Sequence, residues 1–297
     1  MENRDISVII VTYNHEAFIA QALESVLAQN HSLIREIIIG DDCSSDHTVE
    51  IVKSYQEKYP DLIQLVERPH NVGVNENYAD LFNRCNGAYT AILEGDDYWL
   101  PGKLEIMYQE TQKNGDAVMW FHRFQVLQDG KLKERDYLYN KDCRIGIEDF
   151  VTDNQIQNLS CCLYQTDILK KVSPVFRKGP GVDYLLHILI LDGNQAGFVN
   201  RNLSVYRHHG NSIWSRLSRE HQIVRNMLRR YEMNDLTDKK YDELFQRNID
   251  NLLNYLVRLR SYRSKPEQNV VESKADRHKC FNILGIKIKI KKRKKNA

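Results

Sequence analysis

Residues 88–99 read Ala-Tyr-Thr-Ala-Ile-Leu-Glu-Gly-Asp-Asp-Tyr-Trp, a short apolar run that ends directly in two adjacent carboxylates, Asp96 and Asp97. The run 88–93 is typical of a buried strand. Two neighbouring anions raise each other's pKa, and a divalent cation would relieve that repulsion. A cation held by one or two carboxylates commonly shares its coordination with a substrate phosphate. The stretch therefore predicts a metal and phosphate site at the end of a strand.

Other apolar runs also end in polar clusters, and segments with helical spacing of apolar residues lie between them. The expected strands are residues 6–11, 36–40, 62–67 and 88–93. Strands that alternate with helices predict an α/β fold with a mostly parallel, doubly wound, Rossmann-like sheet. Ligands of such sheets bind at the carboxyl ends of the strands. The polar clusters Tyr13-Asn14, Asp41-Asp42 and Asp96-Asp97 would then meet at one edge. Asn14, and Ser44 or Ser45, are expected to cap the helices that follow them.

Composition excludes several classes of protein. No apolar stretch approaches the roughly 20 residues of a membrane span, and the polar, acidic start is unlike a secretory signal, so a cytoplasmic protein is expected. The six cysteines form no C-x-x-C pair and are expected to be reduced thiols. The net charge is +2, but seven basic residues lie in the last twelve, and without them the remaining chain carries −5. Nucleic-acid binding is therefore not expected of the body.

Five motifs in this order resemble the nucleotide-sugar glycosyltransferases of family 2, which have the GT-A fold. They are residues 7–14, residues 37–46, Asn71-Val72-Gly73 with Asn77, the pair Asp96-Asp97, and residues 206–212. The resemblance covers roughly residues 5–215. It implies a GT-A catalytic domain over residues 1–215, with a nucleotide-binding half (1–100) and an acceptor-side half (101–215). A helical extension at 216–263 and a linker with a basic tail at 264–297 would follow.

The resemblance also implies roles for the polar clusters. Asp97 would bind the metal, Mn²⁺ or Mg²⁺, and Asp96 would lie at the ribose or in the metal shell. Asp42 would accept a hydrogen bond from the N3–H of a uracil, with Asp41 nearby and Tyr13 against the base. The further nucleotide contacts expected are Thr12, Asn14, Asn71, Arg207 and His209, and His209 is also a candidate metal ligand. The alternatives are a solvated acidic turn at 96–97 and helix capping by Asp41 and Asp42.

An inverting transfer needs a carboxylate within hydrogen-bond reach of the acceptor hydroxyl. Asp183 follows Lys178-Gly179-Pro180-Gly181 and opens an apolar helix, and the resemblance places the general base there too. The alternative is that Asp183 is only a helix N-cap. Weaker candidates for the base are Asp149, Asp153 and Asp167. Trp99 would either contact a sugar or belong to the core.

We therefore expect a metal-dependent, inverting, hexosyltransferase-type enzyme that moves a sugar from a UDP-sugar to a saccharide acceptor hydroxyl. A cell-surface polysaccharide such as capsule, lipopolysaccharide or O-antigen is the expected product. The basic tail would hold the enzyme peripherally on the inner face of the membrane, which suits a lipid-linked acceptor; the alternative is a solvated charge run. A sugar-activating nucleotidyltransferase would need a Gly- and Lys/Arg-rich loop that residues 11–17 lack. A catalytically inactive binding scaffold remains the non-enzymatic alternative.

Overall fold

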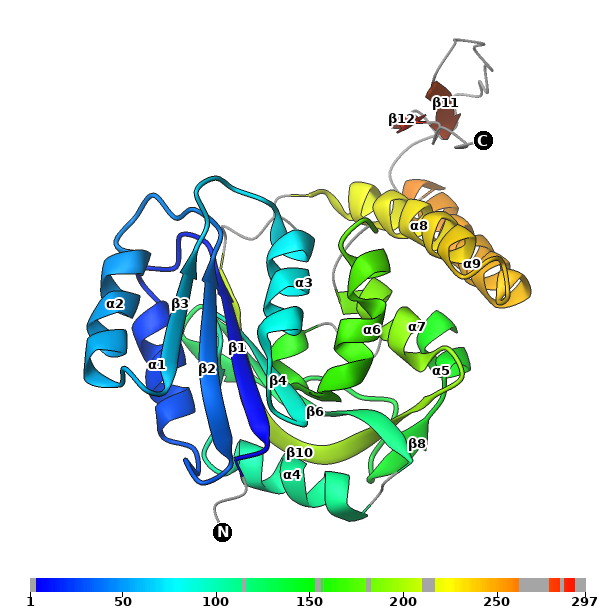
Figure 1. The fold of residues 1–297 in the computed structure, drawn as a ribbon. Coiled ribbons are helices and arrows are strands. Elements are labelled where there is room, and N and C mark those ends of the chain that lie inside the picture. The colour runs from blue at the N-terminus through cyan, green and yellow to red at the C-terminus, as the bar shows by residue number, and fades with distance from the viewer. Residues whose placement is uncertain are drawn as a thin grey trace. The chain divides into compact units, whose positions relative to one another are not determined.

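The computed structural model describes residues 4–113, 116–152, 156, 158–179, 183–209, 217–261, 278–283 and 286–291. The chain divides into two compact units, Met1–Asn248 and Ile249–Ala297. The first unit is built on one mixed sheet whose strand order is β3-β2-β1-β4-β9-β6-β10-β5. Figure 1 shows β3, β2 and β1 side by side at one end of this sheet.

The N-terminal half of the sheet is parallel. It contains β1 (Ile6–Thr12), β2 (Ile34–Asp41), β3 (Ile63–Glu67) and β4 (Tyr89–Glu94). Strand β1 lies between β2 and β4, and its register sets Thr12 opposite Asp41 and Val11 opposite Glu94. The polar strand ends therefore meet at one edge of the sheet, which confirms the doubly wound arrangement expected from the sequence.

Helices cover both faces of this sheet because each strand is apolar on both sides. Ile6, Val8 and Ile10 share one core with α1 (Ile19–Leu27), α2 (Thr48–Lys58) and α4 (Lys103–Lys113). Ile9 and Val11, which point to the opposite face, share the other core with the remaining helices of the sheet. These are α3 (Val74–Arg84), α5 (Ile147–Thr152), α6 (Thr166–Phe176) and α7 (Asp183–Leu191).

The second half of the sheet is mixed. Strand β9 (Cys162–Gln165) follows the short 3₁₀ helix η1 (Leu159–Cys161) and runs antiparallel between β4 and β6 (Ala117–Gln128). Strand β10 (Gln195–His208) runs parallel to β6 and antiparallel to the two-residue β5 (Tyr98–Trp99). Two short strands, β7 (Lys131–Lys133) and β8 (Cys143–Ile145), pair antiparallel with β6 and β10, respectively. Pairing with β5 brings the end of β10 beside the Asp96-Asp97 turn.

Beyond the sheet the chain is helical, as expected. The helices are α8 (Arg219–Leu236) and α9 (Asp242–Ser261), and α9 spans the division between the two units. In the second unit, β11 (His278–Ile283) pairs antiparallel with β12 (Ile286–Lys291). Among the described residues, no helix combines the length and apolar character that a membrane crossing requires. The cysteines at 43, 85, 143, 161 and 162 are free thiols.

Two expected helix caps are wrong. The N-cap residues of α1 and α2 are Phe18 and His47, and neither makes a side-chain cap hydrogen bond. Asn14, with a left-handed φ of 56°, instead joins two loops: its N–H donates to Ser44 Oγ (2.9 Å) and its Oδ1 accepts from Ser45 N (2.8 Å). The polar side chains thus connect the end of β1 to the loop after β2.

Lys103, at the start of α4, offers a test of this packing. It is fully buried, its ammonium donates to the Ser160 carbonyl (2.9 Å), and burial lowers its pKa to about 7. In the unfolded chain the Lys103 ammonium has a pKa of about 10.4 and keeps its proton well above pH 7. The unfolded state therefore binds more protons than the folded state between about pH 7 and pH 10, and the free energy of unfolding rises with pH in that range. We expect the free energy of unfolding of the wild type to rise by about 2 kcal/mol between pH 7 and pH 9 relative to Lys103→Met. Urea unfolding at each pH measures the difference, and parallel profiles would contradict it.

Candidate active site

A cavity opens at the carboxyl edge of the parallel half of the sheet. Its walls come from the ends of β1 and β4, the loop after β2 and the first turns of α3. The lining residues are Val11, Thr12, Tyr13, His15, Asp42, Val74, Tyr78, Glu94 and Asp96. The structure therefore gathers four of the expected site residues, Thr12, Tyr13, Asp42 and Asp96, around one cavity. Tyr13 lies at the surface with 47% of its area exposed, whereas Thr12 is buried.

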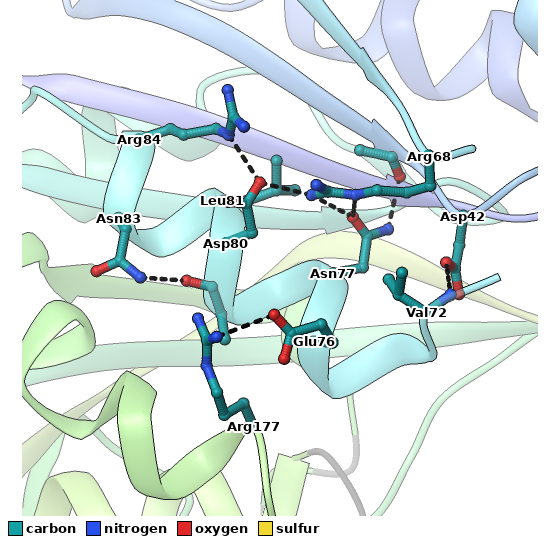
Figure 2. A network of polar contacts seen from close by, with 12 residues as sticks. Asp42, Arg68, Val72, Glu76, Asn77, Asp80, Leu81, Asn83, Arg84 and Arg177 are labelled. Carbon is teal, nitrogen blue, oxygen red and sulfur yellow. Dashed lines mark hydrogen bonds and ion pairs between the residues drawn. The ribbon is translucent and has the colours of Figure 1, made fainter. Parts of the chain in front are cut away.

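Asp42 is held rigidly at this cavity by backbone donors. Its two carboxylate oxygens accept from Val72 N (2.7 Å) and Gly73 N (3.0 Å). Figure 2 shows the contact between Asp42 and Val72. Gly73 has φ +89°, a conformation that favours glycine. Asn71 supports the same loop, because its Nδ2 donates to the Asp42 carbonyl (3.1 Å). Asp41 turns away from the cavity and accepts from both the backbone and the hydroxyl of Ser44.

A polar network fixes helix α3 against the strand ends (Figure 2). Arg68, after β3, donates to Asn77 Oδ1 (3.1 and 3.2 Å) and pairs with Asp80 (2.7 Å). Asn77 is fully buried and donates to the Gly40 carbonyl at the end of β2 (2.9 Å). Arg84 contacts the same Asp80 carboxylate (2.7 Å). These contacts hold the helix whose first turns form one wall of the cavity.

Asp96 faces the cavity between two histidines. Its Oδ2 lies 2.9 Å from His209 Nε2 and 3.9 Å from His15 Nε2. Burial raises the pKa of Asp96, but the His209 hydrogen bond and the charges of both histidines lower it overall. The same hydrogen bond raises the pKa of His209, whereas burial lowers the pKa of His15. At neutral pH Asp96 is thus an anion at the cavity wall.

Asp97 points the other way and is fully buried. Its Oδ2 accepts from Asn158 Nδ2 (2.6 Å) and Ser160 Oγ (2.7 Å), and its Oδ1 accepts from Arg207 N (2.9 Å). Burial and the charge of Asp96 raise the pKa of Asp97 to about 7. It is not among the residues that line the cavity. The two adjacent carboxylates therefore have different surroundings: Asp96 lines the cavity, whereas Asp97, to which the resemblance assigned the metal, is bound to the protein.

Arg207 contacts the site through its backbone N–H, which donates to Asp97. Its guanidinium contacts Gln21 and lies over the rings of Phe18 and Tyr98, at 5.2 and 4.9 Å from their centroids. It does not line the cavity. Trp99, which the sequence left open between sugar contact and core, is 3% exposed and donates to the Ser160 carbonyl (2.9 Å). It belongs to the core.

Asp183 is the first residue of α7. Its charge acts on Glu94, Tyr78 and Tyr206, and on each of them the charges of Asp96 and Asp97 act as well. Asp183 therefore lies within electrostatic range of Glu94, the last residue of β4. Of its rivals, Asp149 accepts from Gly146 N (3.2 Å) at the start of α5 and Asp167 lies in the first turn of α6. Asp153 lies outside the described residues.

Sequence reasoning missed several residues of the site. Ser160 and Asn158 hold Asp97, yet they come from a region without a recognisable motif. His15, Glu94 and Tyr78 line the cavity. Glu94 is two residues before Asp96, and of these residues it is the one that its place beside the Asp96-Asp97 pair could have indicated from the sequence. Burial and the charges of Asp97, Asp96 and Asp183 raise its pKa well above the usual value.

The donor set suits a cation that is shared with a ligand. Within the described part of the chain, no three His, Cys, Asp or Glu side chains are grouped so as to hold a metal ion by themselves. Mg²⁺ at phosphate sites is commonly bound by one or two carboxylates together with substrate phosphates. Asp96, beside the partly buried His209, is a carboxylate of this kind.

Three kinds of comparison relate the chain to known proteins. A family model described as glycosyl transferase family 2 matches residues 7–173. An uncharacterized protein of Mycobacterium tuberculosis is 29% identical over 216 residues, which are 70% of this chain and 60% of that protein. TuaG of Bacillus subtilis, named as a teichuronic acid biosynthesis glycosyltransferase, is 34% identical over 125 residues, or 42% of this chain and 49% of TuaG. The chain thus spans less than two thirds of the length of these relatives.

Solved structures show the same fold. Staphylococcus aureus TarS 1–349 in complex with UDP-GlcNAc has a TM-score of 0.67 at 18% identity, over 88% of this chain and 76% of TarS. The mannosyltransferase PcManGT of Pyrobaculum calidifontis, in complex with GDP-Man and Mn²⁺, has a TM-score of 0.60 at 14% identity. The match covers 88% of this chain and 76% of PcManGT. At these identities the likeness concerns the fold, and it confirms the expected GT-A architecture.

The different surroundings of the two aspartates can be tested by paired substitutions. In Asp97→Asn, an amide NH₂ replaces one oxygen, so at least one of the three donors around it loses its acceptor. We expect Asp97→Asn to lower the free energy of unfolding by about 1–3 kcal/mol, and Asp96→Asn to lower it by less. Urea denaturation of both variants measures this. Equal losses, or a larger loss for Asp96→Asn, would contradict the assignment of Asp97 as the buried member.

Proposed function

This chain belongs to glycosyl transferase family 2, and we propose that it moves a sugar, with inversion, from a UDP-sugar to a hydroxyl of a saccharide acceptor. The observation that carries the proposal is the cavity at the ends of β1 and β4, where Thr12, Asp42 and Asp96 meet. Residues 1–100 would bind the donor and residues 101–215 the acceptor. The helices at 216–263 and the tail at 264–297 would lie outside the reaction.

The nucleoside end of the donor fits the side of the cavity that contains Asp42 and Tyr13. Two backbone N–H groups fix the Asp42 carboxylate, and each of its oxygens has a second lone pair for a uracil N3–H. The exposed ring of Tyr13 offers a flat surface for the base. Asn14, Asn71 and Asp41 would act by holding the loops. The UDP-GlcNAc complex of TarS supports a UDP-sugar.

The diphosphate and a divalent cation, Mn²⁺ or Mg²⁺, would occupy the Asp96 side. Asp96 and His209, whose Oδ2 and Nε2 lie 2.9 Å apart, would hold the cation. Asp97 would join them through Oδ1, which accepts from Arg207 N and keeps a second lone pair, whereas its Oδ2 already accepts from both Asn158 and Ser160. A bound divalent cation supplies positive charge that neutralises the departing nucleoside diphosphate. The Mn²⁺ and GDP-Man in the PcManGT complex support this assignment.

Asp183 would act as the general base. Its carboxylate takes the proton of the acceptor hydroxyl while that oxygen attacks the anomeric carbon. The bond between the anomeric carbon and the diphosphate oxygen breaks at the same time, and UDP leaves from the opposite face. The position of Asp183 at the start of α7 supports this role, because its charge acts on Glu94, on which the charges of Asp96 and Asp97 act as well.

The acceptor would be a growing cell-surface polysaccharide, and the name of TuaG supports this class. The basic tail would place the enzyme peripherally on the inner face of the membrane, near a lipid-linked acceptor. Isoleucine and lysine alternate through β12, which pairs with β11 over the register from His278 opposite Lys291 to Ile283 opposite Ile286. Such alternation is typical of a segment that meets an interface on one side.

Calorimetric titration with UDP, UDP-glucose, UDP-galactose and UDP-N-acetylglucosamine tests the donor assignment. We expect UDP to bind the wild type in Mn²⁺ or Mg²⁺, to bind far more weakly after chelation, and one UDP-sugar to be preferred. Asp96→Asn should lose the metal-dependent part of UDP binding, because the cavity loses its anionic ligand. No binding of UDP or UDP-sugars under any metal condition would contradict the proposal.

The base assignment is tested separately with Asp183→Asn. This variant should bind UDP like the wild type, because Asp183 acts on the acceptor oxygen. Its transfer of the sugar from the preferred donor to an acceptor or to water, measured as the rate of UDP release, should fall by about 10²–10⁴-fold. Near-normal turnover of Asp183→Asn would show that another group is the base.

Membrane attachment is tested by replacing Lys287, Lys289 and Lys291 together with Gln. We expect the wild type to sediment with phosphatidylglycerol vesicles but not with phosphatidylcholine vesicles, and salt to weaken the binding. Loss of three basic residues should cost about 3 kcal/mol, or roughly 100-fold in affinity. A control that replaces the exposed Lys131, Lys133 and Lys171 should bind like the wild type. Equal losses in both triple variants would contradict a role specific to the tail.

A further inference from the structure

Tyr78, on α3, is a buried tyrosine whose hydroxyl has no hydrogen-bond partner among the residues that the structure describes. The residue is completely buried, yet it lines the cavity together with Glu94 and Asp96. Buried hydroxyl groups nearly always find a partner, because an unsatisfied one costs about 1–3 kcal/mol. A ligand that supplies an acceptor at this point would offset that cost.

The Tyr78 ring is held in place by packing against an aromatic ring of its own helix, which in turn packs against α6. It stacks on Phe82 with centroids 5.9 Å apart, and Phe82 packs on Phe176 of α6 at 5.7 Å. The preceding residue, Asn77, is bound by Arg68, and Glu76 pairs with Arg177 (3.0 Å), as Figure 2 shows. The unpaired hydroxyl is therefore on a rigid element, as expected of a preorganised binding group.

Two more unpaired polar atoms belong to residues that line the same cavity. Thr12 Oγ1 and His15 Nδ1 are buried without partners among the described residues. They lie close to one another, since a Cβ at Gly95 would be 3.0 Å from Thr12 Oγ1 and 2.8 Å from His15 Nδ1. One unsatisfied atom can be a local accident of packing. Three around one cavity indicate that a polar ligand completes the hydrogen bonding.

The charges around Tyr78 indicate which part of the ligand it meets. Besides burial, four carboxylates raise its pKa: Glu94, Asp96, Asp97 and Asp183. They include the proposed metal ligands and the proposed base, and two of them, Glu94 and Asp96, line the cavity together with Tyr78. The hydroxyl stays protonated beside these anions and is available as a donor.

We propose that the Tyr78 hydroxyl donates a hydrogen bond to an oxygen at the sugar and β-phosphate end of the nucleotide-sugar donor. This inference rests on the proposed function and adds a residue that recognises the reacting half of the donor. Tyr78 is a binding residue in this proposal and takes no part in proton transfer.

Tyr78→Phe removes only the hydroxyl and tests the proposal in two ways. The variant should be at least as stable as the wild type, because it loses an unsatisfied polar atom and opens no cavity. Its Kd for the preferred UDP-sugar should rise about tenfold, the effect of one hydrogen bond, while its Kd for UMP stays unchanged. Calorimetry with UMP, UDP and the UDP-sugars measures the affinities, and thermal unfolding measures stability. A loss shared by UDP assigns the contact to the β-phosphate, and a loss confined to UDP-sugars assigns it to the sugar.

Tyr164→Phe is the matched control. Tyr164 is equally buried, but its hydroxyl lies 2.9 Å from His187 Nε2 and is satisfied. This variant should lose stability because His187 loses its partner, and it should keep the donor affinities of the wild type.

Several results would overturn the inference. They are a loss of stability in Tyr78→Phe like that in Tyr164→Phe, unchanged affinity for every UDP-sugar, or a loss for UMP as large as that for the UDP-sugar. If the wild type itself bound none of these nucleotides, the proposed function would fail and this inference with it. Wild-type binding that Tyr78→Phe leaves intact would overturn the inference alone.

Discussion

The buried carboxylate of Asp97 is the interaction on which the site depends. It joins the turn after β4 to Asn158 and Ser160 near η1 and to the backbone of Arg207 on β10. A buried anion is tolerated only when hydrogen bonds replace its water, and here three donors do so. Because Asp97 is held on the protein side, its neighbour Asp96 is turned to the cavity. The same bond to the end of β10 brings His209 within 2.9 Å of Asp96.

Ser160 extends this constraint into the core. Its carbonyl accepts from Trp99 Nε1 and Lys103 Nζ, both at 2.9 Å, and its hydroxyl accepts from Glu94 N (3.0 Å) while it donates to Asp97. One residue of η1 therefore joins β4, β5 and α4. On the other side of the cavity, Arg68 and Asn77 fix α3 to the ends of β2 and β3. The cavity thus lies between two rigid walls, a suitable arrangement for binding without large rearrangement.

The same cavity concentrates features that disfavour the unliganded protein. Glu94, Asp96 and Asp97 stand close together, and the charge of Asp183 acts on Glu94. Polar atoms of Thr12, His15 and Tyr78 have no partner among the described residues. A cation and a polar ligand would relieve both the repulsion and the unsatisfied hydrogen bonding, and would stabilise the folded state by mass action. Such local conflicts are expected where a fold is arranged for binding rather than for stability alone.

The sequence by itself determined the parallel half of the sheet, the strand ends and the polar clusters that follow them. These features are local: apolar runs such as 6–11 and 88–93 specify strands by their composition, and parallel strands bring residues 12–14, 41–42 and 96–97 to one edge. The family resemblance rested on the same local motifs. Local reasoning failed where partners are distant in the chain. Asn14 was expected to cap a helix but joins a loop thirty residues away.

Only the tertiary structure decided which of two adjacent aspartates faces the cavity. Nothing within residues 94–99 distinguishes Asp96 from Asp97, because the difference comes from Ser160 and Arg207, more than sixty and one hundred residues later. The unpaired hydroxyl of Tyr78 is likewise invisible in sequence, where Tyr78 reads only as an apolar residue of a helix. Strand pattern depends on neighbours along the chain, whereas the partner of a buried polar group depends on which segments the fold brings together.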